Sequence, residues 1–457
     1  MLASSRNLPT GDASVRKSIV ALLVIAAIVV LISPGIIGRI AEESVESNLQ
    51  WAADENQGIV VTSERFDRSW FSSQGRHRVE IHDPGIREAL ATLAGRDPAD
   101  GDPTLVIDTR IDHGLIAVTS VGRTEGSLAP GLGRGVSTLV IEYPDGASIP
   151  VPGKVYSTIG LNGALRANYI VEPGTLVADG STARWGDANI EISTDYKAQR
   201  FDIDGTIESL AVSDAGDTLR LGKTAFSGVQ RPSRFGISVG DFEISADSVA
   251  VEEAGVETYR LGPVALSGTS GIDGERVNGD VRMSIDALAV PGYGESDFTV
   301  AIRFTGLDGA ALGHMVRTVD DVGDNAGPQE LRLLLQDDFE RLVAAGFELH
   351  VDQFDFDMPQ GPVALTMRFT VEESGAAAVD LSSLLMTLDA EAQLTASAGF
   401  VDHAMAMNPE AGAIVGMGYL RKNGDAYEMR AEYAKGLLTI NGAPMPIPMG
   451  GQPPAID

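Results

Sequence analysis

The chain of 457 residues contains ten Asp-Gly and Asn-Gly dipeptides, which constrain its fold more than any other feature. Such dipeptides favour the type I′ hairpin turn, in which both central residues adopt positive φ. Between them run segments of alternating apolar and polar residues, rich in β-branched side chains, as is typical of half-buried strands. The pattern predicts antiparallel meander sheets rather than a parallel sheet. The dipeptides begin at Asp100, Asp145, Asn162, Asp179, Asp204, Asp273, Asn278, Asp308, Asn423 and Asn441.

A weak internal repeat occupies the middle of the chain. Leu-Ala-Val at 210–212, Val-Ala-Val at 249–251 and Leu-Ala-Val at 288–290 recur every 39 residues, and the segment 213–228 resembles 252–268. Periods of this length occur in stacked supersecondary units that share a core. Because the copies are few and degenerate, we predict a long meandering sheet in preference to a solenoid or a propeller.

Helical periodicity concentrates between residues 309 and 345. Pro328 suits the first helical position, and Gly346 is placed to end the helix. The pattern predicts one amphipathic helix that covers a sheet face. Flanking segments predict a short helix at 84–94, strands at 347–357 and 363–371, partly helical structure at 376–417, and a closing hairpin of 426–433 and 436–444. The apolar stripe of the main helix consists of Leu331, Leu334, Leu335, Phe339, Leu342 and Val343.

Residues 18–38 form an apolar run without a charge, long enough to cross a bilayer as a helix of ~20 residues. The run exceeds the ~7–15 apolar residues of a cleavable signal, so we expect a retained anchor; a removed signal peptide is the alternative. Arg16 and Lys17 precede it, whereas Glu42, Glu43 and Glu46 follow it. By the positive-inside rule, residues 1–17 stay cytoplasmic and the rest is exported.

The predicted fold class is therefore mainly β (α+β). An N-terminal transmembrane helix at 18–38 precedes a helical stalk at 39–56. A β-rich periplasmic region with the 39-residue repeats follows at 57–308, and an α+β periplasmic region with the covering amphipathic helices occupies 309–457. The sheets are expected to be extended antiparallel meanders.

Charge and composition exclude several classes of function. The net charge of −30 leaves no basic stripe for nucleic acid, so we predict no nucleic-acid partner. It also argues against broad docking on anionic headgroups, which requires clustered Lys and Arg. The chain has no cysteine, which excludes disulfides, thiolate metal sites and a lipid-modified N-terminal cysteine.

Four places in the chain together resemble a known family. They are the segments 66–73, 111–115, 331–371 and 436–442. With the N-terminal anchor, this arrangement resembles the YdgA-like family of bacterial envelope proteins, whose function is not established. The resemblance implies a protein of the Gram-negative inner membrane with a periplasmic body, and it supplies no catalytic residues. Ser69 and Leu115 depart from the family pattern, where we expect glycine and proline. The motif positions are Phe66, Arg68, Trp70, Phe71, Ser72, Ser73, His113, Gly114, Asn441 and Gly442.

No pattern of residues predicts a catalytic, cofactor or metal site. Asp112 and His113 are adjacent on a strand and therefore point to opposite faces. Asp402-His403 meets a similar objection, because no second histidine stands at ligand spacing. The acidic segment 320–325 lacks the alternate ligands and final Glu of a calcium loop. Asp352, Asp355 and Asp357 lie on one alternating strand, with only the last two on a shared face.

The leading functional hypothesis is a non-enzymatic, membrane-anchored periplasmic protein with a binding or scaffolding role in the cell envelope. It would bind a lipid or an envelope protein along a groove on one apolar sheet face. The first alternative is an extracytoplasmic hydrolase with a dispersed active site that includes His113. The second is an assembly partner that adds a strand at an exposed sheet edge.

Overall fold

The computed structural model describes residues 59–68, 72–81, 87, 101–113, 133–160, 162–178, 181–195, 200–214, 216–290, 294–322, 327–374 and 386–445. It divides into two compact units. Unit 1 comprises Met1–Val229 with Ala246–Tyr259, and unit 2 comprises Gln230–Ser245 with Arg260–Asp457. The boundary expected at residues 308 and 309 falls inside unit 2.

The N-terminal predictions lie outside the described residues. These are the cytoplasmic segment 1–17, the membrane span at 18–38 and the stalk at 39–56. The short helix expected at 84–94 also lies there, except for Arg87. Among the residues that the structure describes, no helix has the length and apolar character needed to cross a membrane.

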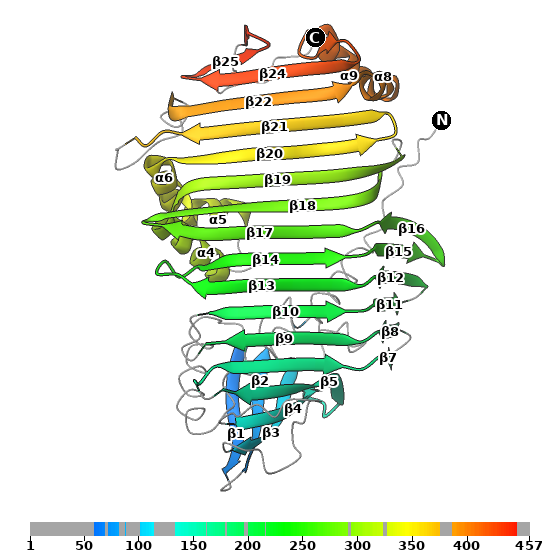
Figure 1. Ribbon diagram of the computed structural model, residues 1–457, viewed down its shortest axis with the longest axis vertical. Helices are drawn as coiled ribbons and strands as arrows, with labels where there is room; N and C mark the ends of the chain where they lie inside the picture. Colours follow the sequence, from blue (N-terminus) through cyan, green and yellow to red (C-terminus); the bar gives the residue numbers. More distant parts are fainter. Residues whose placement is uncertain are drawn as a thin grey trace. The chain divides into compact units, whose positions relative to one another are not determined.

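The main sheet of unit 1 is an antiparallel meander, as predicted. Each strand pairs with the next one named, and an excursion separates β6 from β9 (Figure 1). The strands are β1 (Ile59–Arg68), β2 (Ser72–Ile81), β3 (Thr104–His113), β4 (Gly133–Glu142), β5 (Ser148–Ile159), β6 (Leu165–Val171), β9 (Ala188–Thr194) and β10 (Phe201–Ile207).

This sheet encloses its own core. Val79 on β2 and Leu105 on β3 belong to the same buried cluster as Ile190 and Ile192 on β9, although three strands of the meander separate β3 from β9. All four side chains are at most 2% exposed. Alternation along the strands brings the apolar residues to one face, and this face is shielded from water.

Hairpins that leave the main sheet build a second sheet of six antiparallel strands. A backbone hydrogen bond from a glycine to a serine recurs where the chain passes between the main sheet and these hairpins. Gly186 N donates to Ser209 O over 3.0 Å, and Gly222 N donates to Ser248 O over 2.8 Å. The six strands are β7 (Gly174–Ala178), β8 (Ser181–Trp185), β11 (Leu210–Asp214), β12 (Asp217–Leu221), β15 (Val249–Glu253) and β16 (Val256–Leu261).

The sequence repeat coincides with these hairpins in two of its three copies. Residues 210–212 begin β11 and residues 249–251 begin β15, at equivalent places in the six-stranded sheet. The third copy, 288–290, instead ends β18 of unit 2 and pairs with β19. In the first two copies, one strand ends and the next begins just before the repeat. In the third copy, β18 continues through this point, with a register shift between Ile285 and Leu288 and a φ of 55° at Ala287.

Unit 2 contains a second antiparallel meander with longer strands (Figure 1). Its central part runs in chain order from β17 to β22 and then to β24. The short strands β23 (Arg421–Asn423) and β25 both pair with β24, and β26 pairs with β25. The remaining strands are β14 (Ser238–Ala246), β17 (Val264–Asp273), β18 (Arg276–Val290), β19 (Gly294–Asp308), β20 (Phe347–Met358), β21 (Gly361–Val371), β22 (Leu388–Ser397), β24 (Ala426–Ala434), β25 (Leu437–Ile440) and β26 (Ala443–Met445).

The helices of unit 2 whose bounds the structure describes lie at the two ends of these strands (Figure 1). At one end are α4 (Gly309–Val322), α5 (Pro328–Leu334) and α6 (Gln336–Ala345); at the other are α8 (Ala398–Met407) and α9 (Pro409–Gly416). Pro328 begins α5 and Gly346 caps α6 with a φ of 71°, as predicted.

The single helix expected over 331–343 is wrong, because the chain breaks into α5 and α6 at Leu335. The predicted apolar stripe is therefore not continuous. Leu342 and Val343 are buried, but Leu334 is 45% exposed and Phe339 is 48% exposed.

Among the described dipeptides, only Asn441-Gly442 forms the predicted turn with positive φ at both residues. In the dipeptides that begin at Asp145, Asn162, Asp273 and Asn423, the glycine alone has a positive φ. Asn441 (φ 53°) and Gly442 (φ 77°) connect β25 to β26 as a two-residue turn with both φ values positive. Two dipeptides instead lie inside strands. Asp204-Gly205 is in β10 and Asn278-Gly279 is in β18. A Cβ atom at residue 279 would lie only 2.6 Å from Phe304 Cζ, so glycine there makes room for an aromatic ring from the next strand.

Candidate functional site

The middle of the unit 2 sheet carries an apolar surface that we call the open apolar face. Cross-strand partners form three parallel rows over the strands from β17 to β24. The face consists of Leu266, Met283, Val300, Phe354, Leu365, Leu394 and Met429 in the first row, Val281, Ile302, Val351, Met367, Ala392 and Ala431 in the second, and Phe304, Leu349, Phe369, Ala390 and Tyr433 in the third.

β21 shows how the helices leave this face uncovered. Val363, Met367 and Val371 point to one face, because even spacings separate them in an unshifted register with β22. Val371 is buried against Val343 of α6, and Val363 packs against the cluster that contains Val401 of α8. Met367, which lies between them, is only partly buried. The helices therefore cover both ends of the strands but not their middle.

The exposure of the open apolar face distinguishes it from the core of unit 1. Val281 is 39% exposed and its cross-strand partner Ile302 is 38% exposed. Of the side chains that form the face, Val351 alone is buried, at 8% exposure. Large contiguous apolar surfaces are uncommon on soluble proteins and mark sites of interaction.

The opposite face of the same sheet is polar and internally paired. Arg303 donates two hydrogen bonds to Asp352 over 2.8 and 2.9 Å. His350 Nε2 lies 2.9 Å from Glu348 Oε2, and Arg368 lies 3.5 Å from the other oxygen of Glu348. The hydrogen bond from Arg303 lowers the pKa of Asp352. The pKa of Glu348 is lowered mainly by its hydrogen bond with His350 and also by the positive charge of Arg368. The two faces of one sheet thus differ sharply in polarity.

The acidic residues of β20 are placed differently from the prediction. The register shifts between Val351 and Phe354, which inserts one extra residue and restarts the alternation. Asp352 therefore shares the polar face with Asp355 and Asp357, and it pairs with Arg303.

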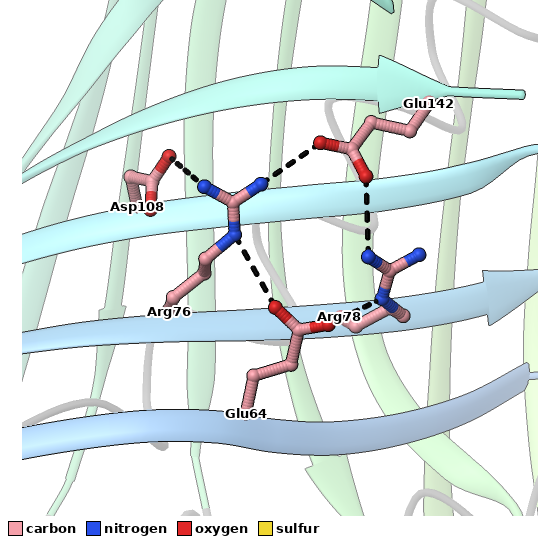
Figure 2. Close-up of polar contacts among 5 residues, drawn as sticks. All are labelled: Glu64, Arg76, Arg78, Asp108 and Glu142. Atoms are coloured by element: carbon pink, nitrogen blue, oxygen red, sulfur yellow. Dashed lines mark hydrogen bonds and ion pairs between the residues drawn. The ribbon is translucent and has the colours of Figure 1, made fainter. Parts of the chain in front are cut away.

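A charged cluster in unit 1 is the second candidate site (Figure 2). Arg76 lies 2.8 Å from Glu142, 3.3 Å from Glu64 and 3.6 Å from Asp108. Arg78 lies 2.8 Å from Glu64 and 3.2 Å from Glu142. The hydrogen bond that Arg78 donates to Glu64 lowers the pKa of Glu64 and raises the pKa of Arg78. Because carboxylates surround both guanidinium groups, this cluster joins β1, β2, β3 and β4 rather than offering a site for an anion.

His77 lies on the other face of β2, inside the core. It is 3% exposed, and its Nε2 atom has no hydrogen-bond partner. Burial lowers its pKa, partly offset by Asp108. Thr109 and Ser137 are also buried there and share a hydrogen bond of 2.8 Å. The alternation of β2 predicts an inward position for residue 77, but only the tertiary contacts identify its unpaired nitrogen.

Two of the predicted motifs meet at one end of the unit 1 sheet. Ser73 pairs with Ile111 and Ser72 pairs with Asp112, so the segments 66–73 and 111–115 are neighbours. Arg68 is opposite Ser73. Phe66 is opposite Gly75, and His113 is opposite Gly133. Trp70, Phe71 and Gly114 lie outside the described residues.

Another motif, Asn441-Gly442, lies far along the chain from these two, and Asn441 has a structural role. Asn441 Oδ1 accepts a hydrogen bond from Arg430 N over 2.9 Å, and Asn441 Nδ2 donates to Gly418 O and Tyr419 O over 3.1 and 2.9 Å. The side chain therefore joins the closing hairpin to β24 and to the segment after α9.

Metal ligation receives no support from the part of the chain that the structure describes. No group of three or more His, Asp or Glu side chains there could hold an ion. Asp402 and His403 lie on α8, and Asp320 and Asp321 lie near the end of α4.

Comparisons with known proteins give one match. The family profile described as "Bacterial protein of unknown function (DUF945)" matches residues 15–448. No curated protein and no solved structure matches the chain.

Proposed function

Because the chain belongs to the bacterial family of unknown function DUF945, we propose its function from its own residues. The protein is a membrane-anchored envelope protein whose unit 2 sheet binds an apolar partner on the open apolar face. The observation that carries this proposal is the partial exposure of that face in the middle of the sheet, where Val281 and Ile302 are 39% and 38% exposed.

The proposed location rests on the sequence. The uncharged run 18–38 follows Arg16 and Lys17, which favours a single span with the body in the periplasm. The resemblance to YdgA-like envelope proteins agrees with this orientation. The anchor would keep the open apolar face close to a bilayer, which is one source of apolar ligands.

A binding role agrees with the chemistry of both candidate sites better than catalysis does. The open apolar face presents hydrocarbon side chains, and the charged groups of Figure 2 are engaged with one another. Hydrolysis requires a nucleophile within hydrogen-bond reach of a base. His77, whose Nε2 atom has no hydrogen-bond partner, lies buried in the core of unit 1.

Cysteine protection tests the binding function and the location together. The chain has no native cysteine, so Ile302→Cys introduces a unique thiol on the open apolar face. Val256→Cys on β16 is the matched control, because Val256 is 68% exposed on the six-stranded sheet. Both full-length variants are treated in intact cells with a small membrane-impermeant maleimide. The rate at which each thiol reacts with the maleimide in cells is divided by the rate for the same variant after it has been purified and freed of its ligand.

We expect the thiol at 256 to react in intact cells and the thiol at 302 to be protected until purification. Equal normalised rates at both positions would show an unoccupied face and refute the binding function. Reaction at position 256 only after cell lysis would refute the periplasmic location.

A further inference from the structure

We propose that the occupant of the open apolar face is hydrocarbon, namely acyl chains of membrane lipids that lie across the strands. This inference rests on the proposed function and names the ligand class of the same site. The evidence is the polarity of the face, its dimensions, and the placement of charge around it.

The face offers almost no polar group to a ligand. It carries no charged side chain, and its one hydroxyl group belongs to Tyr433 at the edge of the third row. The backbone groups between β17 and β24 are engaged in the ladders of an antiparallel sheet with strands on both sides. A ligand that matches this surface needs no hydrogen bonds over its whole length, and an acyl chain meets that condition.

The dimensions fit acyl chains better than a protein partner. The first row spans seven strands spaced ~4.8 Å apart, a length of ~29 Å; the second spans six strands and the third five, and three rows at two-residue spacing give a width of ~14 Å. The resulting flat area of ~340 Å² is less than half of the ~800 Å² that each partner contributes to a standard protein interface. The length is close to the ~30 Å thickness of a bilayer's hydrocarbon core, so one chain from a single leaflet lies along it with room for another.

Charge disfavours a second copy of this chain and predicts indifference to the lipid headgroup. The net charge of −30 makes two copies repel each other. Arg303 and Arg368 belong to the opposite, polar face, where carboxylates pair with both. The ligand is therefore recognised through its chain. Met283, Met367 and Met429 add side chains that adapt to different chain shapes.

A photoactivatable lipid tests this inference. The full-length protein is placed in nanodiscs that contain phosphatidylcholine with a diazirine on its palmitoyl chain, and the adducts are mapped by peptide mass spectrometry. A second preparation carries the same chain on phosphatidylethanolamine, which like phosphatidylcholine has no net charge, so repulsion between the acidic protein and an anionic headgroup does not enter the comparison. Adducts on peptides of the 18–38 segment serve as the internal positive control.

We expect adducts on β18, β19 and β20 in similar yield with both headgroups. The double variant Val281→Asp/Ile302→Asp should lower these adducts about tenfold and leave those of the anchor unchanged, because a carboxylate against hydrocarbon is strongly unfavourable. The control variant Val177→Asp/Val256→Asp changes two side chains of the six-stranded sheet that are each 68% exposed, and it should have no effect.

Two outcomes would overturn the inference. The first is an anchor that is labelled while unit 2 of the unmodified protein is not, a result independent of whether the variants fold. The second is a yield that depends strongly on the headgroup. If the thiol at position 302 is still protected in cells, the proposed function stands and the occupant is something other than an acyl chain.

Discussion

At the scale of single residues, His77 Nε2 is one of four buried side-chain atoms without a hydrogen-bond partner among the residues that the structure describes. His77 is buried beside apolar residues of β2 and β3, with no partner for Nε2. A buried polar atom without a hydrogen bond costs about 1–3 kcal/mol of folding free energy. Burial also favours the neutral imidazole, which lowers the pKa of His77 in the folded state.

The lowered pKa of His77 has a defined effect on stability. Above the unfolded-state value of about 6.5, the imidazole is neutral in both states and the shift contributes nothing. As the pH falls below 6.5, the unfolded chain binds the proton first, so the free energy of unfolding decreases until the folded-state pKa is reached. The protein should therefore lose stability in mildly acidic solution.

Replacing this side chain by an apolar one tests both effects. We expect His77→Leu to raise the free energy of unfolding by about 1 kcal/mol at pH 7.5, because the unpaired nitrogen is removed. The gain should be larger at pH 5.5. Denaturant unfolding of both proteins at the two pH values measures this. An equal difference at both pH values would contradict the assigned pKa shift.

At the scale of elements, Arg276 attaches the helical end of unit 2 to the sheet. Its guanidinium group donates to Gly306 O over 2.9 Å, to Gly346 O over 3.2 Å and to Ala345 O over 2.7 Å. These carbonyls belong to β19 and to the C-terminal end of α6. One side chain thereby binds the end of a helix to two strands.

Loss of this group should loosen α6 locally. We expect Arg276→Ala to lower the opening free energy of α6 by about 2 kcal/mol, since hydrogen bonds to a charged group contribute roughly 1.5–3 kcal/mol. Amide hydrogen exchange in 336–345 should then accelerate about 30-fold. Arg276→Lys should give an intermediate rate, because a single ammonium group cannot serve three carbonyls. Arg282→Ala, an exposed position on the same strand, is the control. Unchanged exchange in Arg276→Ala would disprove this role.

At the scale of the whole molecule, the two units handle the same alternating pattern differently. Unit 1 encloses its apolar face so completely that Val79 and Ile111 are 0% exposed. The described helices of unit 2 lie over the ends of its strands, and Val281 and Ile302 in the middle contact solvent. This difference is the basis of the proposed binding role.

Removal of the N-terminal run tests the mode of attachment. If residues 1–38 are replaced by a cleavable signal, we expect the body to fractionate with the soluble periplasmic proteins. The reason is that the chain has no cysteine for lipid attachment and no other uncharged run of this length. Fractionation and immunoblotting beside the full-length protein measure the outcome. Continued membrane association would mean that the body itself binds the membrane.

Local sequence was sufficient for the type of fold and for one complete hairpin turn. Alternation predicted the strands of the meander, and Asn441-Gly442 predicted a hairpin turn, because both signals depend on backbone geometry within a few residues. The same reasoning misplaced Asn278-Gly279, which is inside a strand. There the ring of Phe304, 25 residues later in the sequence, occupies the space above the glycine.

The sequence by itself determined that this chain is an antiparallel meander with one apolar side per strand and an apolar N-terminal run. Only the tertiary structure decided which apolar side is closed and which is open. Alternation specifies the face to which Val79 and Val281 point, since this depends on the two-residue period of a strand. Whether another layer then covers that face depends on contacts between distant segments. The split of the predicted 331–343 helix at Leu335, and the coverage of the strand ends alone, were decided at that level.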